Sequence, residues 1–157
     1  MKKILFITLV VPFLSFGQNY KQTKNYISIG FLDHKTGTSA IGYTRSIFQN
    51  GNNELFVGFG SMIAVNTFVV GYKKYLLRSF IDGYSVVSMQ NIYGMGGSLF
   101  APAVSIGFEK KIWKFLFINI GVNSTIRLSS QEGEGYENNL DNVDFITFPN
   151  LHLNFRY

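Results

Sequence analysis

His152 is the residue of this sequence best suited to acid–base chemistry. It shares one face of a predicted strand with three other polar residues, Asn150, Asn154 and Arg156. A histidine activates a serine nucleophile when the serine hydroxyl lies within hydrogen-bond reach. Asn154 stands where a His-x-Ser pair would have its serine, so the nucleophile would have to come from another strand, for example Ser105 or Ser124. We therefore expect His152 to be a hydrogen-bonded interior residue and the chain not to be an enzyme.

The acidic stretch 131–142 is a candidate for calcium binding, because carboxylate oxygens are the ligands that Ca²⁺ prefers. Its four carboxylates are Glu132, Glu134, Glu137 and Asp141. Their spacing does not match the helix–loop–helix calcium motif, so we expect a solvent-facing loop and no metal site. His34 beside Asp33 is interpreted as a solvated pair at an external loop.

Other signatures of chemistry are missing. The sequence contains no nucleophile elbow, no phosphate-binding glycine loop and no His/Glu zinc motif, so we expect no cofactor. It has no cysteine, which excludes disulfides, thiolate metal sites and a cysteine nucleophile. The formal net charge is +5, and no basic cluster is longer than a pair. Nucleic acid is therefore not an expected partner.

Residues 1–17 have the pattern of a cleavable signal peptide. Lys2 and Lys3 give a positive start, and an apolar run of about 11 residues follows, which is shorter than the roughly 20 residues of a membrane-spanning helix. Small residues precede the expected cleavage between Gly17 and Gln18. We therefore expect an exported chain with one mature domain, residues 18–157.

The mature sequence is typical of β-structure. Charged residues make up 15% of the chain and aromatic residues 17%, whereas an average soluble domain has about 25% charged residues. Stretches of about ten residues, separated by turn residues, predict eight strands. The predicted strands cover residues 26–34, 39–48, 54–64, 67–78, 82–93, 99–109, 114–129 and 144–157. The fifth has mixed alternation, so its register is not fixed by the pattern.

The seventh strand alternates most clearly, with Ile118, Ile120 and Val122 on one side and Asn119 and Asn123 on the other. In a soluble barrel the polar side would face water and carry many lysines and glutamates. Here the polar positions are mostly small and uncharged, which favours a crowded interior. The sequence thus predicts an all-β fold, an eight-stranded antiparallel transmembrane up-and-down β-barrel. Its expected interior polar cluster is Asn119, Asn123, Arg127, Asn150, His152, Asn154 and Arg156.

Three predicted strands repeat an aliphatic residue, a glycine and an aromatic residue, with a basic residue one or two positions later, such as Lys73 or Lys74. These strands run in the same direction, so the aromatic side chains would form a ring at one level. Aromatic rings suit a lipid–water interface, and basic side chains just beyond them can reach headgroups. The expected girdle, with the last strand included, is Tyr43, Tyr72, Phe108, Phe155 and Tyr157.

The last strand alternates up to a terminal aromatic residue, Tyr157. With the signal peptide and eight strands, this ending resembles the small OmpA/OmpX-like family of bacterial outer-membrane β-barrels, over nearly all of residues 18–157. The resemblance implies the bacterial outer membrane as location, with its lipid, lipopolysaccharide and the barrel-assembly machinery as partners. With both chain ends in the periplasm, the external loops would be residues 35–38, 65–66, 94–98 and 131–142.

The expected function is therefore a structural or surface-interaction role, with external loops available for contacts and no surface partner identified. Three alternatives remain open at this point. The first is a lipid-modifying enzyme, such as a lipid A hydrolase, that uses His152. The second is a channel for ions or small solutes. The third is a soluble periplasmic, lipocalin-like barrel with apolar faces turned inward around an apolar ligand.

Overall fold

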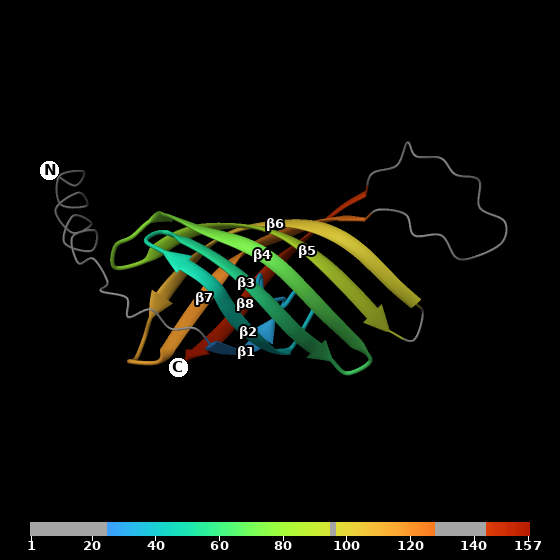
Figure 1. Cartoon of the computed structure of the whole chain (residues 1–157), viewed down its shortest axis with the longest axis horizontal. Helices are drawn as coiled ribbons and strands as arrows, with labels where there is room; N and C mark the ends of the chain where they lie inside the picture. Colours follow the sequence, from blue (N-terminus) through green and yellow to red (C-terminus); the bar gives the residue numbers. More distant parts are fainter. Residues whose placement is uncertain (1–24, 95–96, 128–143) are drawn as a thin grey trace, which may run out of the picture.

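The computed structural model describes residues 25–94, 97–127 and 144–157, which form one closed, antiparallel β-barrel (Figure 1). Each strand pairs with its neighbours in sequence, and β1 also pairs with β8, which closes the barrel. The strands are β1 (Asn25–Phe31), β2 (Ile41–Asn50), β3 (Asn53–Met62), β4 (Val65–Leu77), β5 (Asp82–Gly94), β6 (Gly97–Lys111), β7 (Leu116–Arg127) and β8 (Asp144–Arg156). The predicted eight-stranded antiparallel barrel is confirmed, with strand ends within a few residues of those expected.

Several predictions concern parts of the chain that are not described. The signal peptide, its cleavage between Gly17 and Gln18, and the acidic stretch 131–142 all lie outside the described residues. Within the described part of the chain, no helix has the length and apolar character needed to cross a membrane.

Side chains alternate between the lumen and the outer surface along each strand. On β4, Val70 and Tyr72 are exposed on the outside, whereas Gly71, Lys73 and Tyr75 are buried inside. This is the period of two that a pleated strand imposes. Because the same rule holds around the barrel, the outer surface is largely apolar and the lumen holds buried charged side chains such as Glu54, Lys73 and Glu109.

The strand with mixed alternation in the sequence, β5, obeys the same rule. Tyr84, Val86 and Ser88 are buried in the lumen, and Val87 and Met89 are exposed on the outside. Its register is fixed on both sides, by β4 and by β6. The mixture in the sequence therefore reflects apolar residues that fill the lumen, not a break in the strand.

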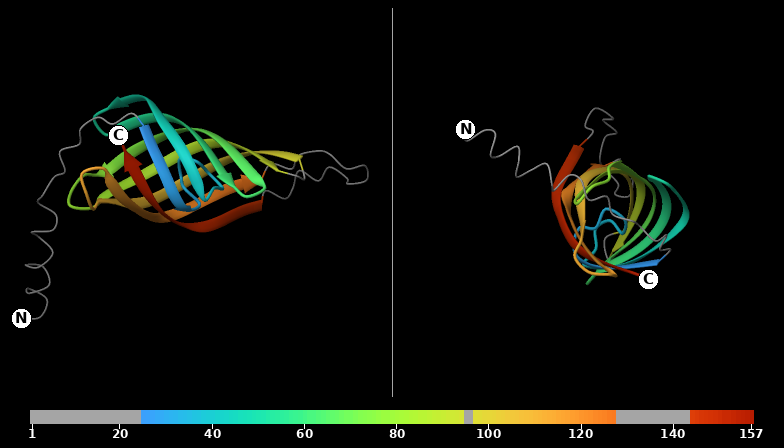
Figure 2. Two further views of the ribbon diagram at one scale, coloured as in Figure 1. Left: turned by 90° about the horizontal axis from the view of Figure 1, so that it is seen from below. Right: turned by 90° about the vertical axis from the view of Figure 1, so that its left-hand side faces the viewer.

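The connection between β1 and β2 folds back into the barrel (Figure 2). We call residues 32–39 the inward segment. It starts at Leu32, whose φ of 55° turns the chain, and Asp33, His34 and Lys35 are each at most 3% exposed. The expectations that residues 35–38 form an external loop and that Asp33 and His34 are a solvated pair are therefore wrong.

Glycines on the neighbouring strands make room for the inward segment. A Cβ atom at Gly58 would overlap the carbonyl oxygen of Lys35, and one at Gly60 would overlap the side chain of Ser39. Close approach of two backbones requires residues without side chains. These glycines therefore admit to the lumen a segment whose length alone is typical of an exposed loop.

We expect Gly58→Ala to lower the free energy of unfolding by about 1–3 kcal/mol, because an added methyl group in a filled interior forces its neighbours to move. The measurement is urea unfolding of the purified barrel followed by circular dichroism. Gly83→Ala is the matched control, because the nearest atom to its added Cβ lies 3.6 Å away, an ordinary contact. Equal midpoints for the two variants would contradict this account of the inward segment.

Candidate functional site

The lumen holds a network of buried ion pairs. Lys35 Nζ lies 2.6 Å from Glu54 Oε1, and Lys73 Nζ lies 2.9 Å from Glu109 Oε2. Arg156 also pairs with Glu109. Buried charges persist in proteins only when they are paired, because removal from water costs several kcal/mol per ion. The two carboxylates thus explain why three cations lie inside the barrel.

Aromatic rings complete the environment of these cations. Lys35 Nζ lies 3.8 Å from the ring centroid of Tyr26, and Lys73 Nζ lies 4.0 Å from that of Tyr84. The Arg156 guanidinium lies 3.7 Å from the ring of Phe117. A cation over an aromatic face is attracted by the ring quadrupole, so these rings stabilise the charges as well as fill space.

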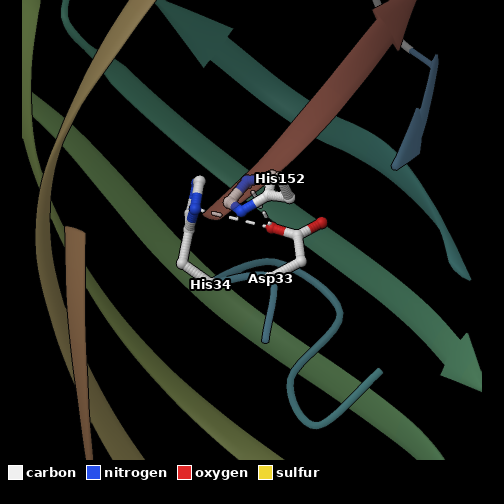
Figure 3. Close-up of side chains that lie close together, drawn as sticks. All are labelled: Asp33, His34 and His152. Atoms are coloured by element: carbon white, nitrogen blue, oxygen red, sulfur yellow. Dashed lines mark ion pairs between the residues drawn. The ribbon is translucent and has the colours of Figure 1, made fainter. Parts of the chain in front are cut away.

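A second cluster consists of Asp33 and His34 from the inward segment and His152 from β8 (Figure 3). Asp33 Oδ1 lies 3.0 Å from His152 Nε2 and 3.4 Å from His34 Nδ1. The two imidazole rings are 5.0 Å apart between centroids. The same nitrogen, His34 Nδ1, is hydrogen-bonded to the Tyr84 hydroxyl at 3.2 Å. All members of this cluster are buried.

Local structure determines where the Asp33 carboxylate points. Its Oδ1 accepts the backbone N–H of Lys35 at 2.9 Å, and its Oδ2 accepts the hydroxyl of Thr36 at 3.2 Å. These are the contacts of a turn in which aspartate caps the backbone that follows it. Opposite Asp33, β8 passes Gly30 of β1 so closely that a Cβ there would meet the Cα of His152. The turn after Asp33 and the close approach of β1 and β8 therefore hold the Asp33 carboxylate and the His152 ring in place.

The electrostatics of the inward segment follow from this burial. Burial raises the pKa of Asp33, but the neighbouring His152, through its charge and a hydrogen bond to the carboxylate, outweighs this effect, and the pKa of Asp33 lies well below the usual value. Burial lowers the pKa of His34, and the nearby charge of Lys73 lowers it further. Asp33 is therefore a carboxylate and His34 a neutral imidazole near pH 7.

Asparagines surround His152 on the wall formed by β7 and β8. Asn119 lies directly opposite it on β7, and Asn150 and Asn154 flank it on β8. The amide groups of all three are buried, and none has a hydrogen-bond partner among the described residues. Buried polar atoms in folded proteins are satisfied by protein, water or a bound ion. This wall is thus a polar surface suited to water or a polar ligand.

The structure brings together nearly all of the expected interior polar cluster. Six members are buried in the lumen: Asn119, Asn123, Asn150, His152, Asn154 and Arg156. The seventh, Arg127, lies at the end of β7, and its side chain lies outside the described part. The expected girdle residues Tyr43, Tyr72, Phe108 and Tyr157 are exposed on the outer surface, and Phe155 is half-buried.

The basic residue of the girdle motif on β4 was expected one or two positions after Tyr72, at Lys73 or Lys74. Lys74 points outward, whereas Lys73 is buried in the lumen. The physical reason is the period of two, since Lys73 follows Gly71 on the inner face. The same period of two on β3 and β6 places Glu54 and Glu109 inside. Strand alternation in the sequence was therefore a signal from which both interior carboxylates could have been predicted.

The serine candidates for a nucleophile do not meet His152. Ser124 lies on the outward side of β7, where its hydroxyl accepts a hydrogen bond from Thr147. Ser105 is buried, but its hydroxyl has no partner among the described residues. Neither ring nitrogen of His152 is hydrogen-bonded to a hydroxyl in this part of the chain. A serine–histidine pair is therefore not formed here.

Comparison of the chain with protein-family models, with curated proteins and with solved structures finds no match. Function must therefore be inferred from the two surfaces of the barrel itself. These are the apolar exterior and the lumen with its ion pairs and its Asp–His cluster.

We expect Lys73→Met to lower the free energy of unfolding by about 3–5 kcal/mol, because the substitution leaves Glu109 with one cation fewer in a buried site. The matched control is Lys74→Met, one residue along the same strand and exposed on the outside. That variant should change stability by no more than about 0.5 kcal/mol. Urea unfolding of both variants gives the comparison, and equal losses would contradict the buried network.

Proposed function

We propose that this chain is a bacterial outer-membrane β-barrel with a non-enzymatic, structural or surface-interaction role. One observation carries the proposal: the barrel is apolar outside and charged inside. A row of outward side chains crosses four neighbouring strands, from Phe108 to Ile120, Leu151 and Phe31, and each is more than 50% exposed. Outer-membrane barrels have this arrangement, because lipid solvates apolar side chains on the outside and the lumen takes the polar ones.

The soluble, lipocalin-like alternative requires the reverse orientation. Its apolar faces would line the interior and hold an apolar ligand, and its exterior would be polar. In the described part of the chain, Lys35, Lys73, Glu54, Glu109 and Arg156 are buried inside instead. An exterior of exposed isoleucine, leucine and phenylalanine would make such a protein associate in water. This contrast favours lipid as the surrounding solvent.

The tyrosines of the girdle support the same proposal. Tyr43 donates a hydrogen bond to Asn25 at 2.9 Å, and Tyr72 donates one to Asn53 at 2.7 Å. Both acceptors lie at strand ends, so each ring lies on the apolar surface while its hydroxyl reaches the polar rim. This is the arrangement that favours tyrosine at a lipid–water interface.

The proposed location determines the proposed partners. The expected signal peptide would direct export, and the barrel-assembly machinery would insert the folded strands. Outer-membrane lipid and lipopolysaccharide would then surround the apolar surface. A channel is the less favoured function, because the inward segment and its ion pairs occupy the lumen. The external loops remain the surface offered to a partner.

The proposal is tested by fractionation of expressing cells, followed by electrophoresis of unheated and heated samples. We expect recovery with the outer membrane and a shift in mobility on heating, because a closed barrel stays compact until its strand hydrogen bonds are broken. The control is the same fraction boiled before loading, which should show only the slower form. Recovery as a soluble periplasmic protein would overturn the proposal.

A substitution on the outer surface tests the contact with lipid. Ile120→Arg should lower the free energy of unfolding in lipid vesicles by about 2–4 kcal/mol, because a charged side chain near the bilayer midplane is costly. Ile112→Arg is the control, because Ile112 is exposed at the turn after β6 and a charge near the interface costs only about 0–1 kcal/mol. Equal effects at the two positions would place Ile120 outside the bilayer.

A further inference from the structure

Asp33, His34 and His152 bring one carboxylate oxygen and two imidazole nitrogens to one point in the lumen (Figure 3). Their ligand atoms all lie within 4.8 Å of one another. We propose that these three residues bind one divalent first-row transition-metal ion, for which Zn²⁺ is the reference. Two imidazoles with one carboxylate favour such ions over Ca²⁺ and Mg²⁺, which prefer oxygen ligands.

The spacing of the ligand atoms fits a small tetrahedral site. With metal–ligand bonds of about 2.0–2.1 Å, two ligand atoms of a tetrahedron lie roughly 3.3–3.4 Å apart. Asp33 Oδ1 is 3.4 Å from His34 Nδ1 and 3.0 Å from His152 Nε2. The widest separation is no more than 4.8 Å, so closure to tetrahedral spacing needs a movement of less than about 1.5 Å.

The orientation of His152 is a second, independent observation. Its Nε2 is buried and faces Asp33 Oδ1 at 3.0 Å, while its Nδ1 is buried without a hydrogen-bond partner among the described residues, as is Nε2 of His34. Buried polar atoms are satisfied by protein, water or a bound ion, so this cluster has the capacity for a further ligand.

The distribution of charge in the lumen also favours a cation here. Glu54 has Lys35, and Glu109 has both Lys73 and Arg156. Among the described residues, the ion pairs of Asp33 are with the two histidines alone. A divalent metal ion would give this buried carboxylate a fixed positive partner, as the lysines and the arginine do for the two glutamates.

The surroundings match those of ligands held in place by a second set of contacts. The Asp33 carboxylate is fixed by the Lys35 N–H and the Thr36 hydroxyl, which is how ligating carboxylates are oriented in metal sites. The Tyr84 hydroxyl is hydrogen-bonded to His34 Nδ1 at 3.2 Å, so a metal ion bound through this nitrogen would replace that hydrogen bond. Three protein ligands leave the fourth position to water.

The test uses the full chain without an affinity tag, folded in detergent micelles and treated with a chelator. Co²⁺ is added both during refolding and afterwards, and visible absorption reports the tetrahedral ion; Zn²⁺ then competes. We expect one equivalent to bind by at least one of the two routes, with displacement by Zn²⁺ and not by Ca²⁺. Asp33→Asn, His34→Gln and His152→Gln should each weaken binding by at least about tenfold, because each removes a ligand.

The control variant is Ser105→Ala, because Ser105 is buried in the lumen, its hydroxyl has no hydrogen-bond partner among the described residues, and it is not a ligand. Its affinity should equal that of the unaltered chain. Heat-modifiable mobility shows which variants have folded, and three separate ligand substitutions keep the test open if one of them misfolds. Absence of Co²⁺ and Zn²⁺ binding by the folded unaltered chain would overturn the proposal, as would equal affinity in the folded ligand variants. Membrane fractionation does not depend on metal binding. A chain that binds no metal but is recovered with the outer membrane would overturn the metal site and leave the proposed outer-membrane role standing.

Discussion

The constraint on which the whole barrel depends is the pairing of charge in a narrow lumen. Each buried cation must meet a carboxylate, and in eight strands that carboxylate comes from across the interior. Glu109 on β6 pairs with Lys73 on β4 and Arg156 on β8, in both cases across an intervening strand. Lys35 joins the inward segment to Glu54 of β3. A slip of one residue in any of these strands would turn a charge to the outside and leave its partner buried alone.

The inward segment and its glycines are a second consequence of that constraint. A lumen this narrow is filled by side chains or by backbone, and here the backbone of residues 32–39 takes part of the space. Gly58 and Gly60 on β3 face this backbone, while the residues beside them in sequence, such as Phe59, face outward. On β3, glycine therefore alternates with large apolar residues. The glycines leave room for the inward segment in the lumen, and the apolar residues cover the outer surface.

The sequence predicted the architecture well, because strand alternation is local and repeats eight times. It predicted the interior position of His152 and of its asparagine neighbours for the same reason. It did not predict that His34 and Asp33 enter the lumen, since that depends on Gly58 and Gly60, which lie more than twenty residues away. The girdle motif left open which of Lys73 and Lys74 lies outside. Strand alternation decides between them and places Lys73 inside.

The proposed outer-membrane role concerns the outer surface of the barrel, and the proposed metal site concerns its lumen. The two are linked because the same strands are apolar outside and polar inside. If lipid surrounds the exterior, the lumen is the place where the strands can hold polar side chains, so histidine and carboxylate there need no explanation beyond burial. The feature that needs an explanation is that Asp33 meets two imidazoles and not lysine or arginine. A purely structural network would pair Asp33 as it pairs Glu54 and Glu109. The Asp33 cluster departs from that rule, and a tight turn and a close strand approach hold it in place. This departure distinguishes a binding site from side chains that only fill the lumen.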